Sequence, residues 1–239
     1  MLLLFMIMII MKLAFTTFLL MFSIQFKALA QKDYTQEAYQ LILRMNIPDS
    51  VKITASLTTL REGVMLKRYD DAGSSAICMG DHELAKQYRS VRLIDCVNRV
   101  IYTTLINKKT IIQLLNAKKV LSPNQTQIDI LADRLHQYGY TKLSNQNLFW
   151  SVYKKYQTNP RKYYNDLKQV FLLYSFVNEE YSYGVCKAHI KQFIYFTAED
   201  IGYIQLQYIN EKSINKMAQL FCNENSQSKY KWMLILKGY

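Results

Sequence analysis

Turn-forming residues are scarce in this chain of 239 residues, which contains seven glycines and three prolines. Folds rich in β-sheet place glycine and proline at their many turns, so this scarcity argues against a sheet-rich fold. It favours long helices that are joined by few turns. The sequence therefore predicts an all-α protein with a single globular domain. The spacing of its apolar residues indicates about nine helices.

Residues that carry metal or acid–base chemistry are also few. The chain has three histidines and lacks the G-x-S-x-G, H-E-x-x-H, C-x-x-C and phosphate-loop motifs. Cys186 and His189 are spaced as zinc ligands can be on a helix, but a zinc site needs about four ligands. Asp129, Asp133 and His136 share one predicted helix face, which could orient a base but is also typical of a solvated polar face. We therefore expect no metal, no cofactor and no catalytic site.

The N-terminal segment predicts export. A basic start at Lys12 precedes an apolar run from Leu13 to Phe26, and Ala28-Leu29-Ala30 resembles a signal-peptidase site that would leave Gln31 as the mature N-terminus. We expect residues 1–30 to be a signal peptide, with residues 1–10 as an extension upstream of the true start. The mature domain would be residues 31–239, in the periplasm or secreted.

An uncleaved membrane anchor is the alternative for this segment. Residues 1–10 lengthen the apolar stretch to about the 20 residues that span a bilayer. Lys12 would then lie near the centre of the membrane, where a lysine costs about 2.5–3.5 kcal/mol. We expect contact with a membrane only through residues 1–26, and only if the signal stays uncleaved.

Apolar spacing and capping residues divide the mature part into helices. Ser122-Pro123 predicts a helix start with proline in the first turn, and Gly139 predicts its end. Asp95 and Arg99 would pair at i, i+4 on the long helix. The helices are expected at residues 35–45, 49–67, 81–106, 108–120, 122–138, 144–157, 160–182, 185–196, 198–210 and 213–223.

The four cysteines lie in the predicted mature part. An even number in an exported chain indicates two disulfides. A continuous helix from Asp81 would place Cys96 about 22 Å along its axis, too far from Cys78 for a bond that needs Cα atoms within about 7 Å. We therefore expect Cys78 and Cys96 to pair with Cys186 and Cys222. A bend near residue 90 would instead allow Cys78–Cys96 with Cys186–Cys222.

Positive charge is the strongest compositional feature, with 30 basic residues against 18 acidic ones. Removing Lys12 and Lys27 with the signal leaves 28 against 18, a net charge of +10. Such a charge favours anionic partners. We expect an acidic protein or an anionic envelope polymer, and export argues against nucleic acid.

Basic and aromatic residues are interleaved most densely at residues 149–168. Rings can stack on a ligand while cations neutralise it. The alternative is that the rings pack inward and the lysines are merely solvated, and the exposure of Trp150 and Tyr163 distinguishes the two. The predicted binding residues are Trp150, Tyr153, Lys154, Lys155, Tyr156, Arg161, Lys162 and Tyr163.

These features predict an exported, non-enzymatic binding protein, such as an inhibitor or a toxin-neutralising protein. A small envelope enzyme that acts on cell-wall polymer is one alternative, and a structural subunit of an envelope assembly is another. A cleft holding two carboxylates about 5–9 Å apart would favour the enzyme.

Overall fold

The computed structural model of the chain describes residues 32–71, 73–173, 176–177, 180–198, 200, 216 and 219–222. The predicted signal peptide lies outside the described residues, as do nearly all of the helices predicted at 198–210 and 213–223.

The described part is mostly helical, as predicted, but it also contains two short hairpins that the all-α prediction missed. One hairpin pairs β1 (Met65–Asp71) with β2 (Ser74–Cys78), and the other pairs β3 (Phe176–Val177) with β4 (Glu180–Tyr181). The helices of the described part are α2 (Thr35–Arg44), α3 (Asp49–Glu62), α4 (His82–Gln87), α5 (Leu93–Ala117), α6 (Gln125–Ser144), α7 (Asn147–Thr158), α8 (Pro160–Leu172) and α9 (Tyr183–Thr197).

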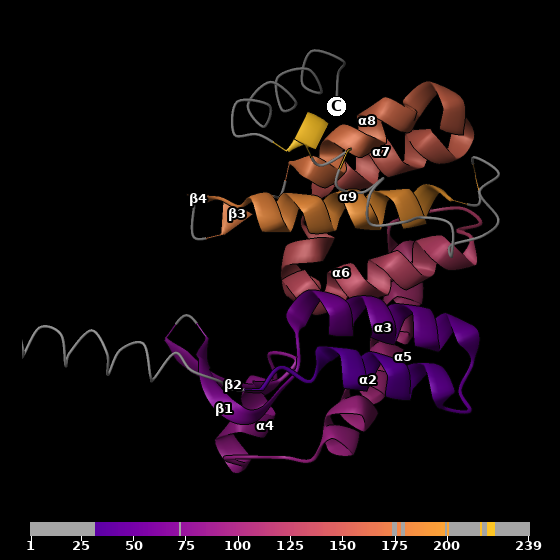
Figure 1. Cartoon of the computed structure of the whole chain (residues 1–239). Coiled ribbons are helices and arrows are strands. Elements are labelled where there is room, and N and C mark those ends of the chain that lie inside the picture. Colours follow the sequence, from indigo (N-terminus) through magenta and orange to yellow (C-terminus); the bar gives the residue numbers. More distant parts are fainter. Residues whose placement is uncertain are drawn as a thin grey trace, which may run out of the picture.

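Neighbouring helices pack in a stack that runs α2, α3, α6, α9, α8 and α7 (Figure 1). The long helix α5 packs against α2, α3 and α6. The β1–β2 hairpin and α4 lie at the end of the molecule opposite to α7 and α8 (Figure 1). The α7–α8 corner is therefore an end of the stack, where side chains of two helices can face solvent.

Local capping explains where several helices begin. Asn159 caps α8 by accepting a hydrogen bond from the backbone N–H of Lys162, and Pro160 occupies the first turn. The start predicted at Ser122-Pro123 is two residues early, because Asn124 caps α6 through the N–H of Gln127. The predicted end at Gly139 is a kink, at which the backbone is left-handed with φ 72° before helical turns resume.

The helix predicted from residue 81 to residue 106 is broken. After α4 the chain becomes extended, and its backbone hydrogen-bonds to β1 from Arg89 and Val91. These bonds replace the helical ones that the sequence alone predicted. The predicted Asp95–Arg99 pair is wrong for the same reason, since Asp95 instead binds Arg92 at the start of α5. Arg99 binds Asp81.

Two disulfides join Cys78 to Cys96 and Cys186 to Cys222, with Cα–Cα distances of 5.3 and 5.7 Å. The expected cross-pairing is therefore wrong, and the pairing that a bend near residue 90 allows is the one found. The extended segment between α4 and α5 turns the chain back, so Cys78 and Cys96, which are 18 positions apart in the sequence, are not separated by a continuous helix.

Aromatic side chains form the larger of the hydrophobic cores, which lies among α6, α7, α8 and α9. The Phe149 ring packs edge-on against Trp150, Phe171 and Phe196, with ring centroids 5.1 to 6.5 Å apart. Edge-on packing suits the charge distribution of aromatic rings. A separate apolar cluster joins α2, α3, the β1–β2 hairpin and the start of α5.

Candidate functional site

The aromatic half of the predicted binding segment belongs to the core. Trp150 is 2% exposed, and Tyr153 and Tyr156 are fully buried. The Trp150 indole donates its N–H to the carbonyl of Leu143 at 3.0 Å. This corrects the expectation that these three rings face a ligand, because burial leaves no ring face for stacking. Tyr163 is half-buried and packs against the same core.

The basic half of the segment remains on the surface. Lys154, Arg161 and Lys162 are exposed, and Lys155 is half-buried. Arg161 and Lys162 lie in the first turn of α8, and this first turn contains no acidic residue. Cations there oppose the helix dipole, which favours negative charge at an N-terminus. Lys162 has one local partner, since its Nζ lies 5.2 Å from the centroid of the Tyr163 ring. The helix dipole does not favour either charge, and an anion placed beside them would be stabilised by both.

The tertiary structure adds a lysine from a distant part of the chain. Lys119, just beyond the C-terminus of α5, lines the same cleft of about 480 Å³ as Lys154. The exposed cations Lys119, Lys154, Arg161 and Lys162 are called the basic corner below. Sequence reasoning missed Lys119, because it lies 35 residues before Lys154. The two come together only because the loop after α5 is hydrogen-bonded to α7.

The loop that carries Lys119 is tied to α7 by one side chain. The Gln157 amide accepts a hydrogen bond from the Leu121 backbone N–H at 3.2 Å and donates one to the Leu121 carbonyl at 2.5 Å. Lys119 itself has φ 55°, and its N–H and that of Val120 bond back to α5. This is the left-handed helix end at which glycine is usual.

Asp200 is the acidic residue among the described residues that line the cleft. Its carboxylate accepts hydrogen bonds from Asn124 at 3.2 Å, Gln127 at 2.8 Å and the Tyr156 hydroxyl at 3.0 Å. Burial raises the pKa of Tyr156, and the nearby Asp200 charge raises it further. The hydroxyl therefore stays a neutral donor, and the carboxylate is engaged by the protein itself.

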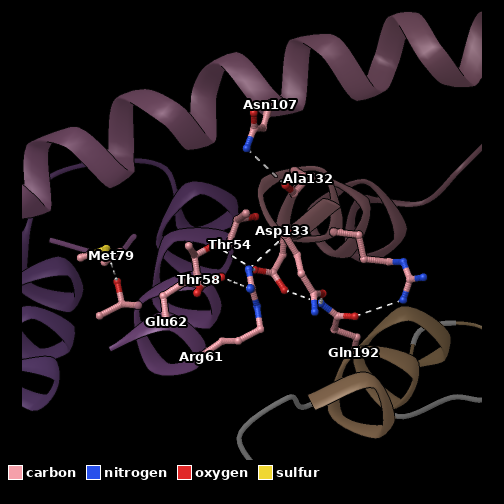
Figure 2. Close-up of polar contacts among 12 residues, drawn as sticks. Thr54, Thr58, Arg61, Glu62, Met79, Asn107, Ala132, Asp133 and Gln192 are labelled. Carbon is pink, nitrogen blue, oxygen red and sulfur yellow. Dashed lines mark hydrogen bonds and ion pairs between the residues drawn. The ribbon is translucent and has the colours of Figure 1, made fainter. Parts of the chain in front are cut away.

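A second polar cluster lies inside the stack, where α3, α6 and α9 meet. Figure 2 shows Arg61 of α3 and Gln192 of α9 converging on the Asp133 carboxylate of α6. Asp133 accepts hydrogen bonds from Thr58 at 2.9 Å, Arg61 at 2.8 Å and Gln192 at 2.7 Å. Asp133 is 1% exposed, so the expected solvated face is wrong at this position.

The neighbouring acid of that predicted face is paired in the same way. Asp129 is 1% exposed and binds Lys108 of α5 at 2.6 Å. The Gln125 side chain also donates to Asp129, at 2.7 Å. Buried charges persist only when they are paired and hydrogen-bonded. The two carboxylates therefore join helices and do not form a reactive pair.

Arg134 links this cluster to the aromatic core. It is fully buried, and its guanidinium lies 4.6 Å from the Phe171 ring centroid and 5.2 Å from that of Phe149. Its two terminal nitrogens donate to Gln192 at 3.2 Å and Gln146 at 3.4 Å. The sequence does not indicate that Arg134 is buried between aromatic rings, because the surrounding segment has the pattern of an ordinary amphipathic helix.

A cleft of about 720 Å³ opens over the Asp133 cluster and is lined in part by Glu62, Asp71 and Lys191. Burial raises the pKa of Asp133, but the charge and hydrogen bonds of Arg61 outweigh burial and lower it. Asp133 is therefore held ionised and cannot supply a proton at neutral pH. Glu62 is paired with Arg61.

Cys186 and His189, the spacing considered for zinc, have other partners. Cys186 is in a disulfide, so it offers no thiolate. His189 is buried, and its Nε2 is 2.5 Å from the Tyr138 hydroxyl. Burial lowers the pKa of His189, and the charges of Arg134 and Arg61 lower it further. The imidazole is accordingly a neutral part of the core.

No protein-family model matches the chain, and a search of curated proteins finds no significant relative. Within the part of the chain that the structure describes, none of the helices is long and apolar enough to cross a membrane.

Proposed function

We propose that the protein is an exported, non-enzymatic binding protein and that the basic corner is its binding surface. One observation carries the proposal: Lys119 of the loop after α5 and Lys154 of α7 line one cleft. The same cleft is lined by Pro160, and the exposed Arg161 and Lys162 follow directly in α8. The partner would be acidic. The net charge of +10 that remains once Lys12 and Lys27 are removed with the predicted signal supports this, because it attracts anions over a distance.

Export to the periplasm or the medium is part of the same proposal. Two disulfides are compatible with either location, since disulfides persist in oxidising compartments. The predicted signal peptide points in the same direction. An inhibitor or toxin-neutralising protein acts in such a compartment by binding its target, without catalysis. A binding surface such as the basic corner is sufficient for that role.

The enzyme alternative has less support. The larger cleft does hold carboxylates, but Asp133 is saturated with donors and Glu62 is paired with Arg61. A general acid needs a carboxyl group that is protonated at working pH, which a lowered pKa opposes. A contact surface therefore accounts better for the exposed charges than a reaction does.

The test reverses two charges of the basic corner in the double variant Lys154→Glu with Arg161→Glu. The protein is purified from cells that express the full chain. The matched control is Arg44→Glu with Arg89→Glu, which changes the net charge equally at exposed positions on α2 and beside β1. Binding to poly-L-glutamate is measured by calorimetry at two salt concentrations.

We expect the corner variant to lose about tenfold or more in affinity and to show a weaker salt dependence, as reversal of interface charges does. The control should keep most of the affinity. Both variants should stay within about 0.5 kcal/mol of the wild-type stability. Equal losses in the two variants would show that net charge, and not the basic corner, governs binding.

A further inference from the structure

We infer that Leu121 is the apolar anchor of the basic corner, and that the partner is an acidic protein surface with an apolar centre. The inference rests on the proposed function and names the kind of partner. Leu121 is 78% exposed, more than any other large hydrophobic side chain in the described residues. Single exposed leucines are common on protein surfaces, so exposure alone would carry nothing.

Leu121 differs from an ordinary surface leucine because its backbone is held on both sides. The Gln157 amide binds both its N–H and its carbonyl, at 3.2 and 2.5 Å. Gln157 is itself in contact with the core, since its amide lies 3.5 Å from the hydroxyl of the buried Tyr153. The leucine is thus displayed from a loop whose position the core determines.

The same loop keeps a backbone conformation that its residues disfavour. Lys119 has φ 55° and Ser122 has φ 43°, so two non-glycine residues in left-handed conformation flank Leu121. Such conformations persist only where the surroundings enforce them, and they gather at functional sites. A rigid display also lowers the entropy lost on binding, because the loop is already ordered.

The neighbours of Leu121 define the chemistry of the partner. Leu121, Lys119 and Lys154 line one cleft, so an apolar side chain stands among cations. A partner that carries only charge would gain nothing from the leucine. A lipid surface takes up a broad apolar face rather than one residue. An acidic protein surface with an apolar centre complements both features, as central anchors and charged rims do in protein interfaces.

The experiment compares two probes of matched length, poly-L-glutamate and a random copolymer of glutamate and tyrosine, with the purified full-chain product. The variant is Leu121→Ala. The matched control is Leu105→Ala, a leucine that is 50% exposed on α5 and lies about 18 Å before the end of that helix. Vesicles of phosphatidylglycerol and phosphatidylcholine test the lipid alternative.

We expect the wild type to bind the copolymer about tenfold more tightly than poly-L-glutamate, because an apolar anchor that becomes buried in the interface increases the affinity. Leu121→Ala should remove this difference without changing the binding of poly-L-glutamate, and Leu105→Ala should keep it. Melting temperatures should be equal, because neither side chain is buried.

Two results would overturn the inference while leaving the proposed function standing. One is that the copolymer binds no more tightly than poly-L-glutamate, or that its tighter binding persists in Leu121→Ala. The other is vesicle binding that depends on Leu121 while the two polymers bind alike, which would assign the leucine to a lipid surface. If the wild type fails to bind poly-L-glutamate at all, the proposed function itself is wrong and the inference falls with it.

Discussion

Replacing Lys119 by glycine separates the stability of the basic corner from its binding. Lys119 occupies the left-handed position that ends α5, with its N–H bonded to the Asn116 carbonyl and the N–H of Val120 bonded to the Leu115 carbonyl. Glycine is the usual residue at such a position because it has no Cβ to clash. The substitution should therefore remove a positive charge and also stabilise the folded state.

The magnitude follows from two opposing terms. A residue with a Cβ in the left-handed conformation costs about 1–2 kcal/mol, and glycine recovers this. Glycine also gains freedom in the unfolded chain, which takes back about 0.4–1 kcal/mol. The net gain is about 0.5–1 kcal/mol, equivalent to a rise in melting temperature of about 1–4 °C for a domain of this size.

Binding should move in the opposite direction. An exposed ion pair contributes about 0.2–1 kcal/mol, so the loss of Lys119 should weaken poly-L-glutamate binding by about 1.4- to 5-fold. Calorimetry measures the affinity, and thermal denaturation followed by circular dichroism measures the stability. Ser122→Gly is the control, because it relieves a second left-handed residue without changing the charge.

Each half of this prediction can fail separately. If Lys119→Gly melts at or below the wild-type temperature, Lys119 is not left-handed in solution. If the variant is more stable but binds poly-L-glutamate as the wild type does, Lys119 is not part of the binding surface. If Ser122→Gly weakens binding equally, the shape of the loop matters and the charge of Lys119 does not.

Three further predictions concern the core. Arg61→Met should cost about 3–5 kcal/mol in urea denaturation, because it leaves Asp133 buried without its cation. Since Arg61 holds the pKa of Asp133 below its usual value, against the effect of burial, the wild type loses this contribution as the pH falls below about 4, and the stability gap to Arg61→Met should narrow on acidification. Trp150→Ala should cost about 3–5 kcal/mol of stability, and an unchanged melting temperature would place the ring at the surface. Non-reducing peptide mapping should recover a Cys78–Cys96 peptide, and a cross-linked peptide joining either cysteine to the C-terminal region would contradict the pairing.

Local signals in the sequence located much of the helical framework. The helix predicted at residues 35–45 is α2, and the start predicted at Pro160 is that of α8. The helix end predicted at Gly139 coincides with a kink, after which α6 continues to Ser144. These features depend on residues within one helical turn of each other, so capping and periodicity suffice to find them.

The disulfide pairing depended on a contact that the local sequence does not show. Residues 81–106 have a helical pattern, yet Arg89 and Val91 bond to the edge of β1. An extended segment gains these bonds only when a strand lies beside it, and here the partner is some 20 residues earlier in the chain. Once the helix is broken there, Cys78 can reach Cys96.

For the candidate site, the sequence by itself determined that Lys154, Arg161 and Lys162 cluster at a helix–helix corner, since they are close in the chain and charged side chains stay in water. Only the tertiary structure decided that Trp150 turns inward and that Lys119 joins the corner. Both outcomes follow from how α5, α7 and α9 pack. Burial of a ring and the meeting of distant lysines are properties of long-range contacts, which no short stretch of sequence encodes.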